Sequence, residues 1–280
     1  MNRLYKDSVF TYLFSDKKNL ISLYNALENK NYPLNTKIEI NTLKGVLFKK
    51  RQNDLSFTIE NRYIVLIEHQ STINDNMPLR LLIYISRLYE RLTSGKAMYK
   101  ERMIPLPTPE FIVLYNGVKK FPQEKVYRLS DAFIGKKKFP QLELIVRVVN
   151  VNYGENKEIM SRCEVLDEYS FFIDKVRKFI ACGNSIECAL KNAIDYCISH
   201  NKLKNFLMKH SSEVRNMLYQ EFNMEDAIEV AKEESFERGV EQGIEQGMER
   251  GMEQGRQEII RNMHLAGLSE DVIKSVLEAK

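Results

Sequence analysis

Residues 53–70 read NDLSFTIENRYIVLIEHQ and contain two segments with the residue patterns of β-strands. In the first segment, apolar Leu55, Phe57 and Ile59 alternate with polar residues, which is typical of a strand with one buried face. The second segment, residues 63–67, is apolar throughout, as expected of a central strand covered on both faces. A short polar turn separates the two segments, so this stretch predicts a β-hairpin at the centre of a sheet.

The length of that turn decides which acidic residues face each other. A three-residue turn at Glu60-Asn61-Arg62 puts Asp54 opposite Glu68, whereas a two-residue turn would put these two acids on opposite faces. We predict the three-residue turn, or a bulged turn of the same parity. Because strand side chains alternate, Glu68 and Gln70 then share one face and His69 points to the other.

Two opposed acids at a sheet end are suited to binding a hard cation. Opposed Cβ atoms lie about 4.5–5.5 Å apart, and Mg²⁺ accepts a few carboxylates while keeping waters that a phosphate can displace. Such an ion activates water and neutralises charge on a phosphodiester. The alternative is that Asp54 and Glu68 are strand-end acids that pair with Lys or Arg.

The rest of the chain predicts an α/β fold with a mixed sheet. Apolar spacing predicts helices over residues 4–27, 78–92 and 158–217, and further strands over 37–40, 111–115 and 142–151. We divide the chain into a core over residues 1–155, a helical region over 156–224 that packs on or follows the core, and a helical tail over 225–280.

The tail contains a four-residue repeat with glycine in every unit, over residues 237–256. Its apolar positions form a narrow stripe on a helix: Val240, Ile244, Met248 and Met252. Five glycines cost a lone helix about 5 kcal/mol relative to alanine, more than this stripe is expected to return. The tail is therefore either mobile or stabilised by a partner copy, and we expect a homodimer or higher homo-oligomer. Residues 263–280 predict two short helices joined at 266–268.

Composition and charge exclude several classes of protein. With 44% hydrophobic and 29% charged residues among 280, the chain is neither disordered nor collagen-like. It has no apolar run of about 20 residues and no apolar signal core, so we expect a cytoplasmic protein that does not bind membranes. Four cysteines without a CxxC pair indicate reduced thiols and not a zinc site.

The charge is unevenly distributed. Residues 1–224 hold 35 basic and 24 acidic residues, a net charge of +11, and residues 225–280 carry a net charge of −7. A basic body suggests a polyanionic partner.

The block NDLSFTIENRYIVLIEHQSTINDNMPLRLLIYISRLYERL, residues 53–92, resembles the PD-(D/E)XK nuclease-type transposase family, also called recombination-promoting nucleases. The segments KDSVFTYLFSDKKNLISLYNAL and ALKNAIDYCISHNKL and the EQG repeats are similar to the same family, so the resemblance covers nearly the whole chain. It implies a restriction-endonuclease-like mixed sheet flanked by helices, with a Mg²⁺-dependent endodeoxyribonuclease site that acts in recombination or mobile-element transfer.

The resemblance also implies a role for each residue of the motif. Asp54 and Glu68 would be catalytic metal ligands for Mg²⁺, or Mn²⁺ in its place, with no organic cofactor. The main-chain carbonyl of His69 would add a ligand, and DNA would be the partner. Gln70 occupies the position of the motif's lysine, and glutamine can hydrogen-bond but brings no positive charge. The alternative is therefore a catalytically weak or inactive DNA-binding or oligomerising protein on a nuclease scaffold.

Two residues outside the motif are possible accessories. Asp7 fits the acid that many superfamily members carry on the first helix, and an exposed first-turn acid is the alternative. Arg80 begins one face of the helix after the motif and could contact a DNA phosphate, whereas a surface arginine is the ordinary alternative. We expect the ring of His69 to be structural, on the other side of the sheet.

Overall fold

A computed structural model describes residues 8–40, 54–93, 99, 101–135, 137–267 and 269. Chain contacts separate it into two units, Met1–Glu221 and Phe222–Lys280. The first unit holds the sheet and all of the shorter helices, and the second holds most of one long helix.

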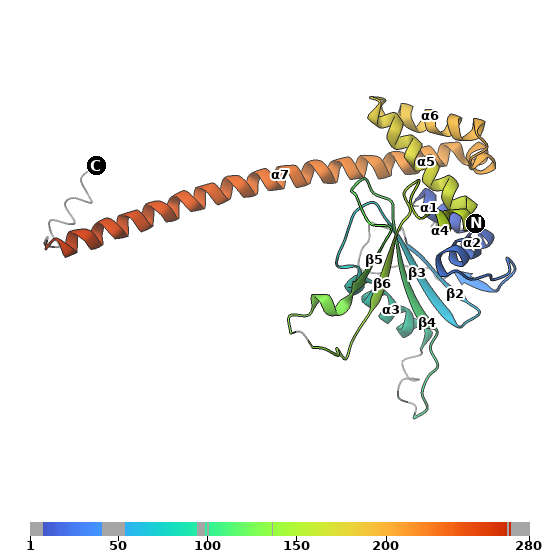
Figure 1. Ribbon diagram of the computed structural model, residues 1–280, viewed down its shortest axis with the longest axis horizontal. Helices are drawn as coiled ribbons and strands as arrows, with labels where there is room; N and C mark the ends of the chain where they lie inside the picture. Colours follow the sequence, from blue (N-terminus) through green and yellow to red (C-terminus); the bar gives the residue numbers. More distant parts are fainter. Residues whose placement is uncertain are drawn as a thin grey trace. The chain divides into compact units, whose positions relative to one another are not determined.

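The first unit is built on a six-stranded mixed sheet with the strand order β1-β2-β3-β4-β6-β5 (Figure 1). The strands are β1 (Ile38–Ile40), β2 (Asp54–Ile59), β3 (Tyr63–Gln70), β4 (Thr108–Tyr115), β5 (Glu124–Arg128) and β6 (Ile145–Asn150). β3, β4 and β6 are parallel neighbours, and the other pairs are antiparallel. The expected α/β fold with a restriction-endonuclease-like mixed sheet is confirmed.

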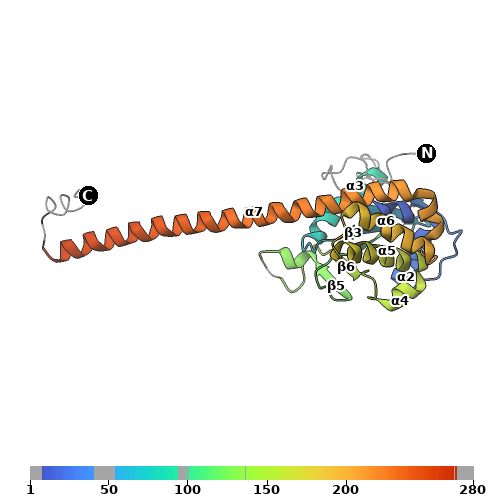
Figure 2. The same ribbon diagram turned by 90° about the horizontal axis from the view of Figure 1, so that it is seen from above.

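Helices cover both faces of this sheet (Figures 1 and 2). The helices of the described chain are α1 (Val9–Phe14), α2 (Lys17–Glu28), α3 (Met77–Leu92), α4 (Lys157–Arg162), α5 (Glu164–Ala181), α6 (Ile186–Ser199) and α7 (Lys204–Leu265), with a short 3₁₀ helix η3 at Leu129–Ala132. Local chemistry sets their starts: the carboxylate of Asp16 accepts the N–H groups of Lys18 and Asn19 at α2, and Pro78 stands in the first turn of α3.

The alternation of β3 divides the core between two layers. Ile64 and Leu66 lie in the cluster that includes Leu81 and Ile85 of α3. On the opposite face, the ring of His69 packs against Phe10 of α1 and Tyr169 of α5. A strand buried on both sides explains the apolar run of residues 63–67.

The hairpin between β2 and β3 has the predicted register. Ile59 pairs with Tyr63, and Asp54 pairs with Glu68. The turn is closed by the N–H of Arg62, which donates to the carbonyl of Ile59 at 2.9 Å. Glu60 and Asn61 adopt left-handed backbone angles, with φ values of 50° and 56°. The three-residue turn is therefore confirmed, and with it the parity that the site requires.

The structure differs from the sequence prediction in two places. β5, an edge strand with four exposed residues among its five, was not predicted, because Glu124–Arg128 lacks a buried alternating pattern of useful length. Residues 263–265 end the long helix α7 instead of forming a separate short one, and Gly267, with φ +80°, follows that end. The second short helix lies outside the described residues.

In the described residues, no helix combines the length and the apolarity that spanning a bilayer requires.

Candidate active site at the carboxyl edge of the sheet

The three parallel strands end together at one edge of the sheet. Gln70 is in register with Tyr115, and Tyr115 with Asn150, so the last residues of β3, β4 and β6 are aligned. We call this row the carboxyl edge. The motif residues Glu68, His69 and Gln70 are the last three of β3 and therefore lie at or beside it.

Glu68 and Gln70 project from the same face of β3, the face covered by α3. The side-chain amide of Gln70 donates to Oε1 of Glu68. The same amide nitrogen lies 3.2 Å from Sδ of Met77, the first residue of α3. Both side chains are buried, with relative exposures of 4% for Glu68 and 8% for Gln70. The position of the motif's lysine is thus filled by an amide that contacts the motif's acid.

Arg80 supplies the positive charge at this site. Its Nη2 lies 2.7 Å from Oε1 of Glu68, and its side chain is only 16% exposed. Its Nη1 lies 3.5 Å from Sδ of Met77. A buried carboxylate is costly unless it is paired and hydrogen-bonded, and Arg80 provides that pairing from one turn into α3. Arg80 is therefore an integral part of the site and not a surface arginine.

The backbone of β2 brings Asp54 to the same place. Main-chain carbonyls of residues 62 and 70 accept hydrogen bonds from the β4 side, so even-numbered residues of β3 bond toward β4. Asp54 and Glu68 are consequently a non-hydrogen-bonded pair, the kind in which opposed residues approach most closely. The side chain of Asp54 lies outside the described residues.

The same alternation gives His69 two separate roles. Its carbonyl is directed toward β2, next to position 54, as an odd-numbered residue of β3 requires. Its ring lies on the opposite face, 4.6 Å from the ring of Phe10 and nearly parallel to it. Burial, and then the charge of Arg177, lowers the pKa of His69 to about 3. The imidazole is therefore neutral at physiological pH and structural, as expected.

The donor atoms at this point suit a hard cation. A carboxylate of Glu68, an acid at the opposed position 54 and a main-chain carbonyl are all oxygen donors, which Mg²⁺ prefers. Arg80 and Gln70 both contact Oε1 of Glu68. Among the described side chains, no three His, Cys, Asp or Glu residues form a group that could hold a metal ion, and the side chain of Asp54 is not among those described.

Sequence reasoning missed a second group at the carboxyl edge. Arg177 of α5 reaches across to Asn116, which follows β4, and to Asn152, which follows β6. The only signal in the sequence was the pair of Asn-containing strand ends at 116–117 and 152–154, which read as turns. Met77 was also missed, because a methionine at a helix start carries no chemical signature.

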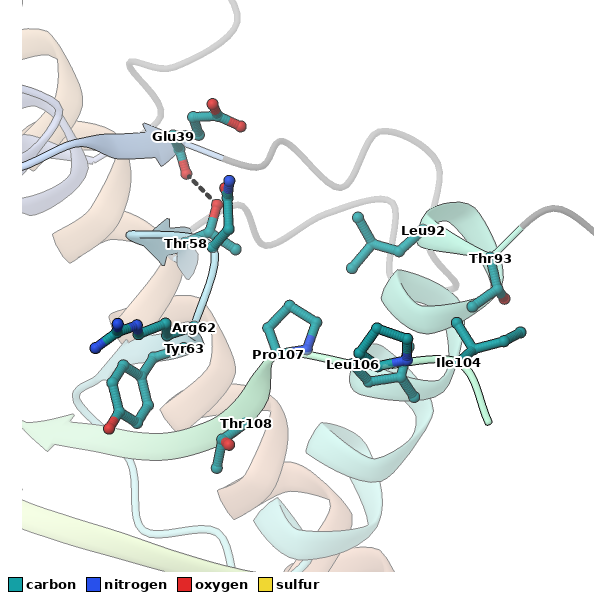
Figure 3. Close-up of a pocket in the computed structure, with 12 residues that line it drawn as sticks. Glu39, Thr58, Arg62, Tyr63, Leu92, Thr93, Ile104, Leu106, Pro107 and Thr108 are labelled. Atoms are coloured by element: carbon teal, nitrogen blue, oxygen red, sulfur yellow. Dashed lines mark hydrogen bonds between the residues drawn. The ribbon is translucent and has the colours of Figure 1, made fainter. Parts of the chain in front are cut away.

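A cavity lies at the other end of these strands. It has a volume of about 600 Å³ and includes Tyr63 and Thr108, the first residues of β3 and β4 (Figure 3). Figure 3 also shows the hydroxyl of Thr58 donating to the carbonyl of Glu39, at 3.3 Å, on its wall. The motif acids are therefore at a sheet edge, where a long polymer can be accommodated, and not in this cavity.

Comparison with known families agrees with this geometry. The model of the family described as "Putative transposase, YhgA-like" matches residues 36–178, just over half of the chain. This chain belongs to the YhgA-like family. That family is part of the PD-(D/E)XK nuclease-like superfamily, so the resemblance inferred from the motif is confirmed. The YhgA-like match contains the hairpin, α3 and the carboxyl edge, whereas Asp7 lies outside both the match and the described residues. No curated protein and no solved structure matches the chain.

Proposed function

We propose that this YhgA-like protein is a divalent-metal-dependent DNA endonuclease that acts in recombination or mobile-element transfer. The observation that carries the proposal is the pairing of Asp54 with Glu68 on one face at the end of the β2–β3 hairpin. The match to a family named for transposases supports DNA as the substrate. The net charge of +11 over residues 1–224 supports a polyanionic partner.

Each motif residue has a defined task in this proposal. Asp54, Glu68 and the carbonyl of His69 hold the cation, with Mg²⁺ as the expected ion and Mn²⁺ as its substitute. When bound, the cation supplies a Lewis acid that activates water and neutralises the phosphodiester. Gln70 fixes the rotamer of Glu68 through its hydrogen bond to Oε1.

Arg80 takes over the charge that the motif's lysine would bring. Its guanidinium contacts the motif glutamate at 2.7 Å, so it lies where a lysine at position 70 would place positive charge. An arginine that contacts a phosphate oxygen stabilises charge on the phosphorane. Because one guanidinium has five donors, Arg80 can contact a phosphate oxygen while it stays paired with Glu68.

Plasmid nicking tests this function. Supercoiled DNA is incubated with Mg²⁺ or Mn²⁺ and the wild-type protein, Asp54→Asn, Glu68→Gln, or the control Glu60→Gln, which changes an exposed acid of the same hairpin. We expect cleavage by the wild type and the control only, with a loss of at least about 100-fold in the two motif variants. Equal nicking by Asp54→Asn would assign the cleavage to a contaminant and would overturn the proposal.

A second candidate function is a DNA-binding protein without cleavage. It is favoured by one observation: Gln70 replaces the lysine, and Arg80 already engages the acid that would ligate the ion. Titration of Mn²⁺ followed by its paramagnetic signal separates the two functions. Saturable binding that Asp54→Asn abolishes favours the nuclease, and duplex binding without any metal site favours the second function.

We further propose that the tail holds copies of this chain together. The stripe residues Val240, Ile244, Met248 and Met252 are 45–67% exposed on α7. A Cβ built at Gly239, Gly243, Gly247, Gly251 or Gly255 meets open space. Sedimentation of the full-length Ile244→Glu/Met248→Glu protein tests this, because two charges on the stripe should lower the oligomeric state. An unchanged state would remove the stripe from the interface.

A further inference from the structure

Arg177 is held in place by neutral groups alone. Its Nη1 donates to Oδ1 of Asn116 at 2.8 Å and to Oδ1 of Asn152 at 3.1 Å. Its Nη2 donates to the main-chain carbonyl of Asn116 at 2.6 Å. Among the residues that the structure describes, no carboxylate lies within 4 Å of this guanidinium. The positive charge is therefore positioned but not compensated.

Arg147 is a useful comparison, because its contacts are those of an arginine that links elements of the fold. Its guanidinium contacts Glu28 at 3.1 Å and Glu124 at 2.8 Å, and it also donates to a main-chain carbonyl. Both arginines are partly buried and both link separate elements. Only Arg147 is neutralised by acids, so a linking role does not account for the lack of an acid beside Arg177.

Arg177 and Asn116 still have N–H groups that are not used within the described chain. Five N–H groups belong to a guanidinium, and the contacts of Arg177 within the described chain use three of them. Nδ2 of Asn116 makes no hydrogen bond in that part of the chain, although Asn116 is 98% buried. A buried donor without an acceptor is unfavourable, and an anion that accepted its hydrogen bond would offset that cost.

The loops that hold these donors adjoin the candidate active site. The N–H of Asn116 donates to the carbonyl of Gln70 at 2.8 Å, so Arg177 contacts the residue bonded to the last motif position. Nδ2 of Asn152 donates to the carbonyl of Gly117 at 3.0 Å. A Cβ at Gly117 would lie 1.9 Å from the carbonyl oxygen of Ser71, so the loops after β3 and β4 are in close contact.

We propose that Arg177 and Asn116 form a phosphate-binding subsite for the nucleic acid, next to the phosphate that is cut. The donors, the uncompensated charge and the place on the carboxyl edge all fit a phosphodiester oxygen. A nucleic-acid strand that crosses the carboxyl edge from the α3 face would contact Arg80 first and Arg177 next. The subsite rests on the proposed function, since it needs a nucleic-acid substrate at that edge.

Asn116→Asp is the decisive variant, because it keeps the shape of the side chain and adds one acid beside Arg177. A purely structural role predicts equal or higher stability and unchanged DNA binding. The phosphate subsite predicts equal or higher stability but binding of a fluorescein-labelled duplex weakened about tenfold at ~0.1 M salt. Anisotropy titrations in EDTA between about 50 and 200 mM KCl should show the salt slope reduced by about 0.9.

Two further variants complete the test. Arg177→Gln should reduce the slope by the same amount, and Arg147→Gln, whose arginine is already neutralised, should leave it unchanged. A wild-type slope in Asn116→Asp would overturn the subsite, even if the protein still nicks plasmid. A wild type that binds no duplex at all would overturn the proposed function itself, so the two failures are distinguishable.

Discussion

Removal of the arginine that faces the motif glutamate should destabilise the first unit strongly. In the Arg80→Met protein the carboxylate of Glu68, 5% exposed, loses the cation that lies 2.7 Å from it. Breaking a buried ion pair by removing one partner costs about 3–5 kcal/mol, because the remaining charge stays desolvated. In a Glu68→Gln background no charge remains, so the same change should cost about 1 kcal/mol. The coupling energy is then about 2–4 kcal/mol.

Urea unfolding in EDTA, followed by tyrosine fluorescence, measures these four proteins. The chain has 14 tyrosines and no tryptophan, and every tyrosine precedes residue 222, so the signal reports the first unit alone. Arg87→Met, on the same helix, is the matched control and should change stability by less than about 0.5 kcal/mol. If Arg80→Met costs the same in both backgrounds, Arg80 is not the counter-charge of Glu68, and the account of the site is wrong.

Three further predictions concern the rest of the first unit. Burial raises the pKa of the Cys163 thiol above its usual value, and it raises the pKa of Cys197 to about 12. A thiol reagent at pH 8 should therefore label only the two exposed cysteines quickly, Cys182 and Cys188, and should label all four after denaturation. Four fast thiols in the native protein would contradict this burial. Gly117→Ala should cost about 1–3 kcal/mol, because its Cβ would meet a main-chain oxygen, whereas Gly135→Ala, in open space, should be neutral by the same urea assay. Glu60→Asn should stabilise the hairpin by about 0.5–1 kcal/mol, since asparagine tolerates a φ of 50° better than glutamate; a loss of stability would show that the turn does not adopt this conformation in solution.

The hairpin was predictable because one short stretch carries both signals that define it. Alternation at Leu55, Phe57 and Ile59 identifies the apolar face of β2, and only an odd turn length aligns that face with the matching face of β3 while Asp54 meets Glu68. The shared face of Glu68 and Gln70 followed from strand alternation, whereas their roles came from the family resemblance. The fold class was predictable for the same reason, since strand and helix periodicities are local.

The partners of these residues were not predictable, because they depend on packing between distant segments. Arg80 looks like any helix arginine in the sequence, and only the docking of α3 brings it to Glu68. The contact between Arg177 and Asn116 joins residues 61 positions apart. β5 was not predicted because it is an exposed edge strand, and its pairing with β6 holds it in the sheet.

The odd length of the β2–β3 turn ties the chemistry of this protein to its ability to fold. Adding or deleting one residue there would move Phe57 to the face that Ser56 and Thr58 now occupy, in the same movement that carried Asp54 away from Glu68. A protein that loses the acid pair through such an insertion or deletion would lose the packing of its core as well, and the unfolded chain would be degraded by proteases. Inactivation by drift must instead come through point substitutions at the edge, which leave a well-folded relative that can still dock on the same substrate.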